Sequence, residues 1–247
     1  MTASAPLILY DSTDSVATIT LNRPKRHNAL NPDICAELAA AWRRFNDSDD
    51  RVAILTGAGK SFCAGADLTN VPDLWRCVPG VGIKVAKPVV AAVRGWCVGA
   101  GVVLVQMCDL CVAAEGTRFS YPEAIVGLTG GLVASIAVRM PHKVAMELLL
   151  TGDEMSVQRA YEVGFVNKLV TEAELMDAAR RYATRLAGHA PMVLETLKEF
   201  VGQTLPKGPT EQAGIARAWT ERIIESRDFA EGRAAFQDKR PPKFEGR

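Results

Sequence analysis

The sequence has no apolar run long enough to cross a bilayer. The longest, from Val98 to Met107, is interrupted by Gln106 and falls far short of the roughly 20 apolar residues that a membrane-spanning helix needs. The chain also has no block of like charge, because 29 Lys and Arg residues are balanced by 28 Asp and Glu residues, for a formal net charge of +1. We therefore expect neither a membrane nor a nucleic acid as a partner.

The cysteines lack the spacing of a disulfide framework. They are scattered through apolar segments, at Cys35, Cys63, Cys77, Cys97, Cys108 and Cys111. The chain does not open with a basic stretch followed by an apolar core, so we expect no secretory signal and a reducing, cytoplasmic location. Cys108 and Cys111 form a C-x-x-C pair, but no second Cys or His pair accompanies them. Buried thiols are therefore favoured over a metal or redox site.

The common phosphate-binding glycine motifs are also missing. Neither G-x-x-x-x-G-K-[ST] nor G-x-G-x-x-G occurs between a predicted strand and a helix, and Gly99-Ala100-Gly101 lacks the third glycine. No acidic residue follows this triplet at a suitable distance. These absences disfavour a dinucleotide-binding fold.

The apolar pattern predicts a single α/β arrangement without repeats or flexible linkers. A hydrophobic content of 48% in 247 residues is enough for a sizeable core. Strands at 89–93 and 110–114 flank a buried helix at 98–107, and this order implies parallel pairing. A hairpin is predicted at 7–21, a helix opening at 31–33, strands at 51–56 and 165–170, and helices at 171–187, 192–204 and 210–229.

Two glycine-rich segments carry the main chemical signal. They are SFCAGADL at 61–68 and VRGWCVGAGVVLVQMCDL at 93–110. Each is predicted to place a tight turn between a strand and a helix, at 64–67 and 98–101, so that small residues let the backbone approach a ligand. Two such backbone N–H groups would suit a developing oxyanion, which points to acyl chemistry. The alternative is that the glycines only permit close packing of helix on strand.

Five separated motifs resemble the crotonase superfamily, which includes the enoyl-CoA hydratases and isomerases. They are NRPKRHNAL at 22–30, SFCAGADL, KPVVAAVRGWCVGAG from Lys87, CDL at 108–110 and FSYPEAIVGL at 119–128, and the terminal KRPPKFEGR extends the likeness. The resemblance implies a crotonase fold of repeated β-β-α units over residues 1–190. It also implies a helical region at 191–247 that packs on the core and a neighbouring subunit, giving a homotrimer or a dimer of trimers.

The resemblance also implies the catalytic groups. The backbone N–H groups of Ala66 and Ala100 would bind the thioester carbonyl of an acyl-CoA substrate and stabilise an enolate, provided that φ of Ala100 stays negative so that its methyl group is tolerated. Hydratases of the family use two glutamates. Val103 stands at the position of the first, and Glu123 at that of the second. A single acid/base suits movement of a double bond better than hydration.

Glu123 has a competing structural interpretation. Pro122 followed by Glu123 is a common helix start, and from the spacing alone that interpretation is favoured, whereas the resemblance favours a catalytic role. If the carboxyl lies in a pocket flanked by Ile125, Val126 and Leu128, we expect desolvation to raise its pKa.

The remaining implied contacts are with coenzyme A, which is part of the substrate; no metal, nicotinamide or flavin is expected. The implied binding residues are Lys25, Arg26, Ala64, Asp67, Leu68, Lys243 and Phe244. Ordinary solvated charge is an alternative for Lys25 and Arg26. Segment 69–85 is shorter than the helical acyl-pocket wall of many relatives, so no acyl-chain length is inferred.

Other side chains are not expected to act in catalysis. None of His27, His142 and His189 has a Ser or Cys partner in a recognisable nucleophile arrangement, and Cys63 and Cys97 are predicted to be packed small hydrophobes. Two alternatives to hydratase or isomerase chemistry remain open. One is another one-carboxylate reaction, such as decarboxylation or thioester hydrolysis, and the other is non-catalytic acyl-CoA binding.

Overall fold

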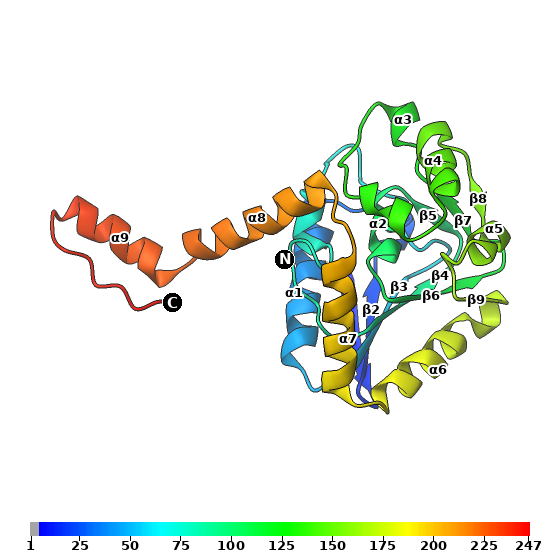
Figure 1. Ribbon diagram of the computed structural model, residues 1–247, viewed down its shortest axis with the longest axis horizontal. Helices are drawn as coiled ribbons and strands as arrows, with labels where there is room; N and C mark the ends of the chain where they lie inside the picture. Colours follow the sequence, from blue (N-terminus) through cyan, green and yellow to red (C-terminus); the bar gives the residue numbers. More distant parts are fainter. Residues whose placement is uncertain (1–4) are drawn as a thin grey trace.

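Two β-sheets form the centre of the protein, whose computed structural model describes residues 5–247 (Figure 1). The larger sheet has the strand order β1-β2-β3-β4-β6-β9 and the smaller has the order β5-β7-β8. The strands are β1 (Ile8–Thr13), β2 (Val16–Leu21), β3 (Val52–Gly57), β4 (Val89–Val93), β5 (Trp96–Val98), β6 (Leu110–Ala114), β7 (Arg118–Ser120), β8 (Met155–Ser156) and β9 (Lys168–Val170). Residues 1–4 of the expected core lie outside the described range.

Nine α-helices and four 3-10 helices connect and cover these strands within residues 5–247. The α-helices are α1 (Pro32–Asp47), α2 (Ala100–Gln106), α3 (Glu123–Val126), α4 (His142–Thr151), α5 (Val157–Glu162), α6 (Leu175–Ala187), α7 (Pro191–Thr204), α8 (Pro209–Ile224) and α9 (Arg227–Gln237). The 3-10 helices are η1 (Pro24–Arg26), η2 (Leu74–Cys77), η3 (Ala134–Val138) and η4 (Glu172–Glu174). No helix in this part of the chain is long and apolar enough to span a membrane.

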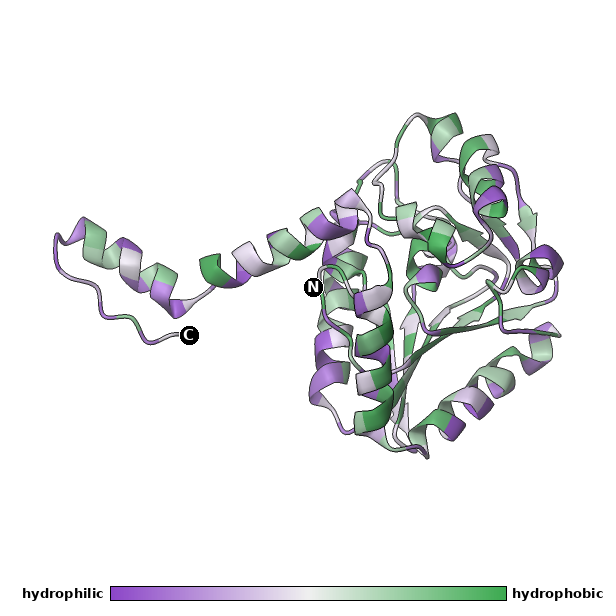
Figure 2. Ribbon diagram, viewed as in Figure 1, coloured by the Kyte–Doolittle hydropathy of each residue, from purple (hydrophilic) through white to green (hydrophobic). Residues whose placement is uncertain are grey.

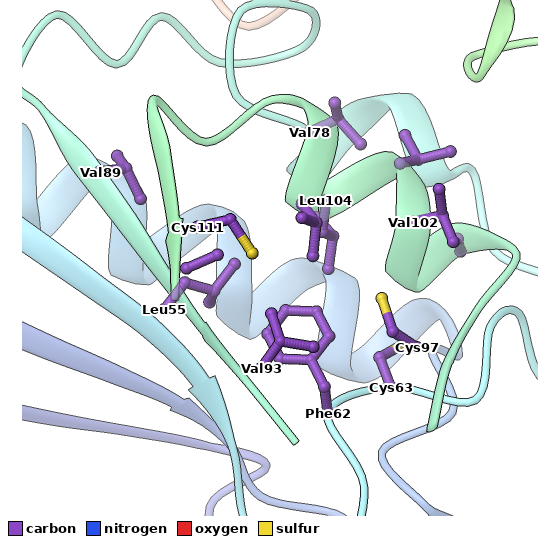
Figure 3. Packing of buried hydrophobic residues seen from close by; sticks show 14 of the residues in the cluster. Leu55, Phe62, Cys63, Val78, Val89, Val93, Cys97, Val102, Leu104 and Cys111 are labelled. Atoms are coloured by element: carbon purple, nitrogen blue, oxygen red, sulfur yellow. The ribbon is translucent and has the colours of Figure 1, made fainter. Parts of the chain in front are cut away.

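The larger sheet confirms the predicted hairpin and the predicted parallel pairing. β1 and β2 are antiparallel, whereas β2, β3, β4, β6 and β9 run parallel to one another. Every residue of β3 and β4 is buried, as expected for strands covered on both faces. Alternate residues point to opposite sides, so that Ile54 and Val90 pack with α6 while Leu55 and Val89 join the larger core (Figure 3).

The helix caps agree with the sequence pattern. Asn31 precedes α1 and its side chain accepts a hydrogen bond from the Ile34 N–H, as an N-cap should. Thr171 and Glu174 form the predicted capping box, which opens η4 and leads into α6.

The smaller sheet was not predicted. Its strands have only two or three residues, too few to show an alternating pattern. The strand expected at 165–170 is also shorter than predicted, because only Lys168–Val170 pairs with β6. Phe165 instead packs edge-on against Phe119 of the smaller sheet, with ring centroids 5.4 Å apart.

The C-terminal region is helical, but the single helix expected at 210–229 is two. α8 ends at Ile224, and the Ser226 side chain accepts from the Phe229 N–H to begin α9. Figure 1 shows α8 leading away from the two sheets and α9 lying beyond it. Both helices, together with α7, carry exposed apolar side chains (Figure 2), including Phe200, Trp219 and Phe236.

Candidate functional site

Short parallel pairing holds the two glycine-rich turns side by side. Cys63 and Cys97 form a bridge in which the Cys63 N–H donates to Trp96 O at 3.0 Å and the Val98 N–H donates to Cys63 O at 2.8 Å. Their side chains are neighbours in the core (Figure 3). A side-chain carbon added at Gly65 would lie 3.7 Å from the Ala100 nitrogen, so the two turns touch at their tips.

Each turn offers one free backbone N–H group. Beside Leu30, the Asp67 N–H donates to Leu30 O and Gly65 O accepts from Leu30, which leaves the intervening Ala66 N–H outside this pairing. Ala100 begins α2, and the first N–H groups of a helix have no acceptor within it. Within residues 5–247 neither N–H donates to another backbone group. The arrangement can therefore present two donors to one oxygen atom.

The backbone meets the condition set for Ala100. Gly99 takes the left-handed conformation at φ 51°, ψ −111°, whereas Ala100 is not among the non-glycine residues with positive φ. The methyl group of Ala100 is thus tolerated without strain. The first turn differs from expectation, because no helix opens at 64–67; the chain continues as a loop to η2, which contains the only helical turn of segment 69–85.

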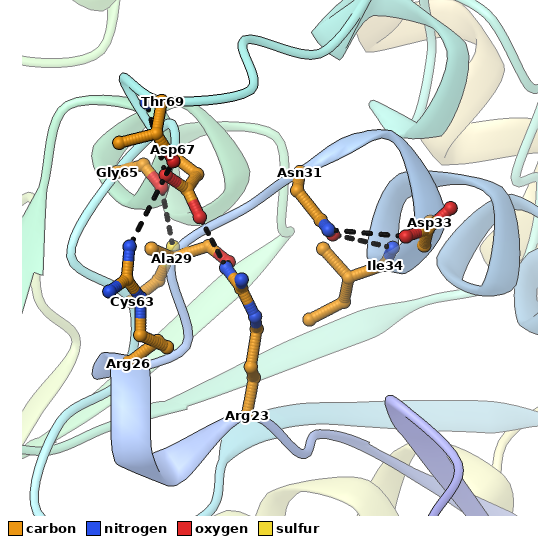
Figure 4. Close-up of polar contacts among 10 residues, drawn as sticks. All are labelled: Arg23, Arg26, Ala29, Asn31, Asp33, Ile34, Cys63, Gly65, Asp67 and Thr69. Carbon is orange, nitrogen blue, oxygen red and sulfur yellow. Dashed lines mark hydrogen bonds and ion pairs between the residues drawn. The ribbon is translucent and has the colours of Figure 1, made fainter. Parts of the chain in front are cut away.

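The Asp67 carboxylate braces the first turn (Figure 4). It accepts from the Thr69 hydroxyl at 2.6 Å and from Arg23 Nη1 at 2.7 Å, while Arg26 lies 3.6 Å away. The hydrogen bond from Thr69, followed by that from Arg23, holds the pKa of Asp67 well below its usual range. Its oxygens are committed to these partners, so Asp67 supports the shape of the turn.

Asn28, which the sequence analysis did not single out, ties the same turn to the preceding loop. Its buried side-chain nitrogen donates to the carbonyls of Ala58, Ser61 and Phe62, and its oxygen accepts from the Arg23 N–H. Asn28 has φ 57°, a conformation in which Asn is enriched among non-glycine residues. The only signal in the sequence was an Asn inside a polar turn.

His27 has a serine neighbour, contrary to the expectation for the histidines. Its Nδ1 lies 3.0 Å from the Ser61 hydroxyl. No carboxylate within residues 5–247 hydrogen-bonds the other ring nitrogen, so the pair lacks the third group that orients a catalytic base.

Glu123 faces the second turn. A side-chain carbon added at Gly99 would lie 2.7 Å from Glu123 Oε1, and Glu123 Oε2 is buried without a hydrogen-bond partner. Burial raises the pKa of this carboxyl from 4.5 to about 7. Glu123 is also the first residue of α3, so the helix-start interpretation and the site interpretation both describe its position.

The burial of Glu123 has a different source from the one predicted. Ile125 is 72% exposed, and Val126 and Leu128 are also largely exposed. The side chain of Ile125 lies instead beside Gly152. The carboxyl is desolvated where it meets the Gly99 turn, because the absent side chain at Gly99 lets it approach the backbone.

The other predicted residues are divided between the site and the C-terminal arm. Val103 is buried in α2 one turn after Gly99, and it brings no carboxylate to the site. Lys25, Arg26 and Leu68 are exposed, and the Ala64 N–H donates to His27 O. In contrast, residues 243 and 244 follow α9, far from α3 in Figure 1.

The cysteines form no site. All six are free, five are buried, and the sixth, Cys108, is partly buried. Burial raises the pKa of the Cys63 and Cys111 thiols to about 12, which suits small packed hydrophobes. No group of three or more His, Cys, Asp or Glu side chains within residues 5–247 is arranged to hold a metal ion.

Residues 11–247 match the model of a protein family described as enoyl-CoA hydratase/isomerase. The chain belongs to that family. The crotonase resemblance seen in the motifs is thereby confirmed, and so is the fold class, which the solved structures of enoyl-CoA hydratase/isomerase proteins share.

Relatives of this enoyl-CoA hydratase/isomerase family member align over almost the whole chain. The (E)-benzylidenesuccinyl-CoA hydratase of Thauera aromatica is 34% identical, over 97% of this chain and 99% of the relative. The carnitinyl-CoA dehydratase of Proteus mirabilis is 35% identical, over 94% and 96%. The crystal structure of carnitinyl-CoA hydratase from Mycobacterium avium superposes with a TM-score of 0.77 at 31% identity, over 99% of this chain and 100% of that one. The protein is an enzyme of this family.

The raised pKa of Glu123 predicts a pH-dependent stability gain on replacing Glu123 with Gln. Between about pH 4.5 and pH 7 the folded state holds a proton that the unfolded state has lost, so the stability of the wild type falls as pH rises through this window. Gln does not ionise, so the variant avoids this loss. Because Glu123 is half exposed, we expect the advantage of the variant at pH 8 over pH 4 to be on the order of 1 kcal/mol.

Urea unfolding at the two pH values measures this difference. Glu115→Gln, at an exposed position, is the matched control and is expected to show little change with pH. Equal pH dependence in Glu123→Gln and the wild type would contradict a desolvated carboxyl.

Proposed function

We propose that the protein binds an acyl-CoA thioester and stabilises its enolate with the backbone N–H groups of Ala66 and Ala100. The observation that carries this proposal is the contact between the two turns, each of which has one donor without an intramolecular acceptor. Such a donor typically contributes about 2.7 to 4 kcal/mol to a transition state in which negative charge develops on oxygen. Removing the proton next to a thioester carbonyl develops that charge.

Glu123 is the proposed single acid/base. Its orphan oxygen lies next to the donor turn, where the carbon adjacent to a bound carbonyl would be found. A pKa of about 7 lets the carboxylate accept a proton and return it near neutral pH. Because Val103 supplies no second carboxylate, movement of a double bond is the favoured reaction, with weak hydration beside it.

Addition or removal of water is the second candidate. The names of the relatives from Thauera aromatica and Proteus mirabilis denote a hydratase and a dehydratase. In this chain Glu123 would have to act on both water and carbon, since position 103 is Val.

The nucleotide end of the thioester is assigned to exposed residues beside the first turn. Lys25 and Arg26 are exposed in η1, and the Asp67 contacts place this helix next to Ala66 and Leu68. Positive side chains here suit the phosphates of coenzyme A.

Replacing Glu123 with Gln is expected to lower the rate by roughly 10²-fold or more while leaving acyl-CoA binding intact, because the shape of the site is kept and only the proton shuttle is lost. The wild-type kcat/KM should rise with pH through about 7, as the base form of Glu123 appears. Product analysis by mass spectrometry over a panel of acyl-CoA substrates gives the rates and also detects decarboxylation or thioester hydrolysis. Binding without turnover of any thioester would instead support a non-catalytic carrier.

Hydration of crotonyl-CoA is expected to be slow relative to isomerisation of a matched β,γ-unsaturated thioester. The missing carboxylate at Val103 deprives water of one of its two activating groups, whereas isomerisation needs only one. Loss of the conjugated thioester absorbance measures hydration, and its appearance measures isomerisation. Hydration as fast as isomerisation would favour the second candidate.

We also propose that the chain assembles as a homotrimer or a dimer of trimers through its C-terminal region at 191–247. On α7, Phe200 is 62% exposed, and on α9, Phe236 is 86% exposed. Phe236 and Phe244 line an apolar hollow between α9 and the C-terminal segment. Apolar surface of this extent is usually buried between subunits.

Sedimentation velocity is expected to give a mass of three or six chains. Phe200→Asp and Phe236→Asp should each lower that mass, because a charge would be buried at the contact. Glu172→Ala, at an exposed position in η4, is the control and should leave the mass unchanged. A monomeric wild type would overturn the assembly proposal.

A further inference from the structure

Two buried polar atoms away from Glu123 have no hydrogen-bond partner. Gln106, at the end of α2, is 3% exposed; its side-chain nitrogen donates to Leu132 O at 2.7 Å, but its Oε1 is left without a partner. Trp75, in η2, is 8% exposed, and its indole Nε1–H is also unpartnered. A buried polar group without a partner costs about 1 to 3 kcal/mol, so two such atoms in one region indicate a missing ligand group or water.

Contacts around α8 place these two side chains in one cluster. Gln106 binds Leu132, which lies one 3-10 turn before Ser135, and the Ser135 hydroxyl donates to Glu211 Oε1. One turn further along α8, Gly214 packs against Trp75: a side-chain carbon added there would lie 3.2 Å from Trp75 Cβ. Trp75 and Gln106 both line a groove of about 1630 Å³ that extends from α1 to α8, which has room for more than a single water.

The charged groups of this cluster are already matched. Glu211 accepts from Ser135 and from the Gly208 N–H, and Arg139 donates to Ser135 O. One donor, Trp75 Nε1–H, and one acceptor, Gln106 Oε1, are left. A hydroxyl group satisfies both, because it accepts from the indole and donates to the amide oxygen. A carboxylate only accepts, and it would face the amide oxygen unfavourably.

The cluster also lies at a defined reach from the donor turns. Ala100 and Gln106 are the first and last residues of α2, so at 1.5 Å per residue they are about 9 Å apart along the helix. An extended chain advances about 1.2 Å per bond, so an acyl chain of about eight carbons spans this distance.

We propose that Trp75 and Gln106 form a specificity subsite for a hydroxyl group at the far end of a medium-length acyl chain. This inference rests on the proposed function, because the thioester carbonyl must be held at Ala66 and Ala100. It narrows the substrate class to hydroxylated acyl-CoA thioesters. Neither residue touches the reacting atoms, so their role is recognition.

The test compares the binding of octanoyl-CoA with that of octanoyl-CoA carrying a hydroxyl on its terminal carbon, by calorimetry. The wild type is expected to bind the hydroxylated thioester about tenfold more tightly or better, since one satisfied pair of buried groups is worth about that much. Gln106→Met keeps the length of the side chain and removes the free acceptor, and Trp75→Phe removes the free donor. Each variant should bring the preference to within about twofold.

Gln203→Met is the matched control, because Gln203 lines the same groove from the exposed side of α7. It should keep the full preference. Equal binding of the two thioesters by the wild type, or a preference that survives in both test variants, would overturn the subsite and leave a buried water as the occupant. If the wild type binds neither thioester, the proposed function fails together with the subsite, whereas binding of octanoyl-CoA without a preference refutes the subsite alone.

Discussion

The parallel bridge between Cys63 and Cys97 is the constraint on which the site depends. Three backbone hydrogen bonds, made by the N–H groups of Phe62, Cys63 and Val98, fix the register of the two glycine-rich segments. A shift of one residue would turn alternate groups to the opposite side, so the Ala66 and Ala100 donors would no longer face one space. The buried thiols have a packing role here, because small side chains let the two segments approach closely.

The same turn that offers a donor also changes the chemistry of the carboxyl. Gly99 has no side chain to hold Glu123 away, so the carboxyl reaches a partly dry position and its pKa rises to about 7. A carboxyl of ordinary pKa would be a weaker base near neutral pH. The burial that destabilises the folded protein above that pKa is therefore the same burial that tunes the group for proton transfer.

The sequence predicted the parts of this arrangement that depend on local patterns. The β1–β2 hairpin, the α1 cap at Asn31 and the strand, helix and strand at 89–114 all follow from apolar spacing and turn residues. The smaller sheet, the break before Ser226 and the exposure of Ile125 depend on contacts between distant segments, which one sequence does not display. The partners of Asn28 belong to this class too, because its amide reaches carbonyls thirty or more residues away.

α8 connects the groove to the assembly. Its first half packs on the core, where Glu211 and Gly214 are buried against Ser135 and Trp75, while Trp219 in its second half is 71% exposed. Ile223 and Ile224 continue that exposed surface. A neighbouring subunit that buries the second half would hold the first half rigidly, since both belong to one helix. The wall of the groove beside Trp75 would then be ordered by subunit contact, which links recognition of the acyl chain to assembly through a single element.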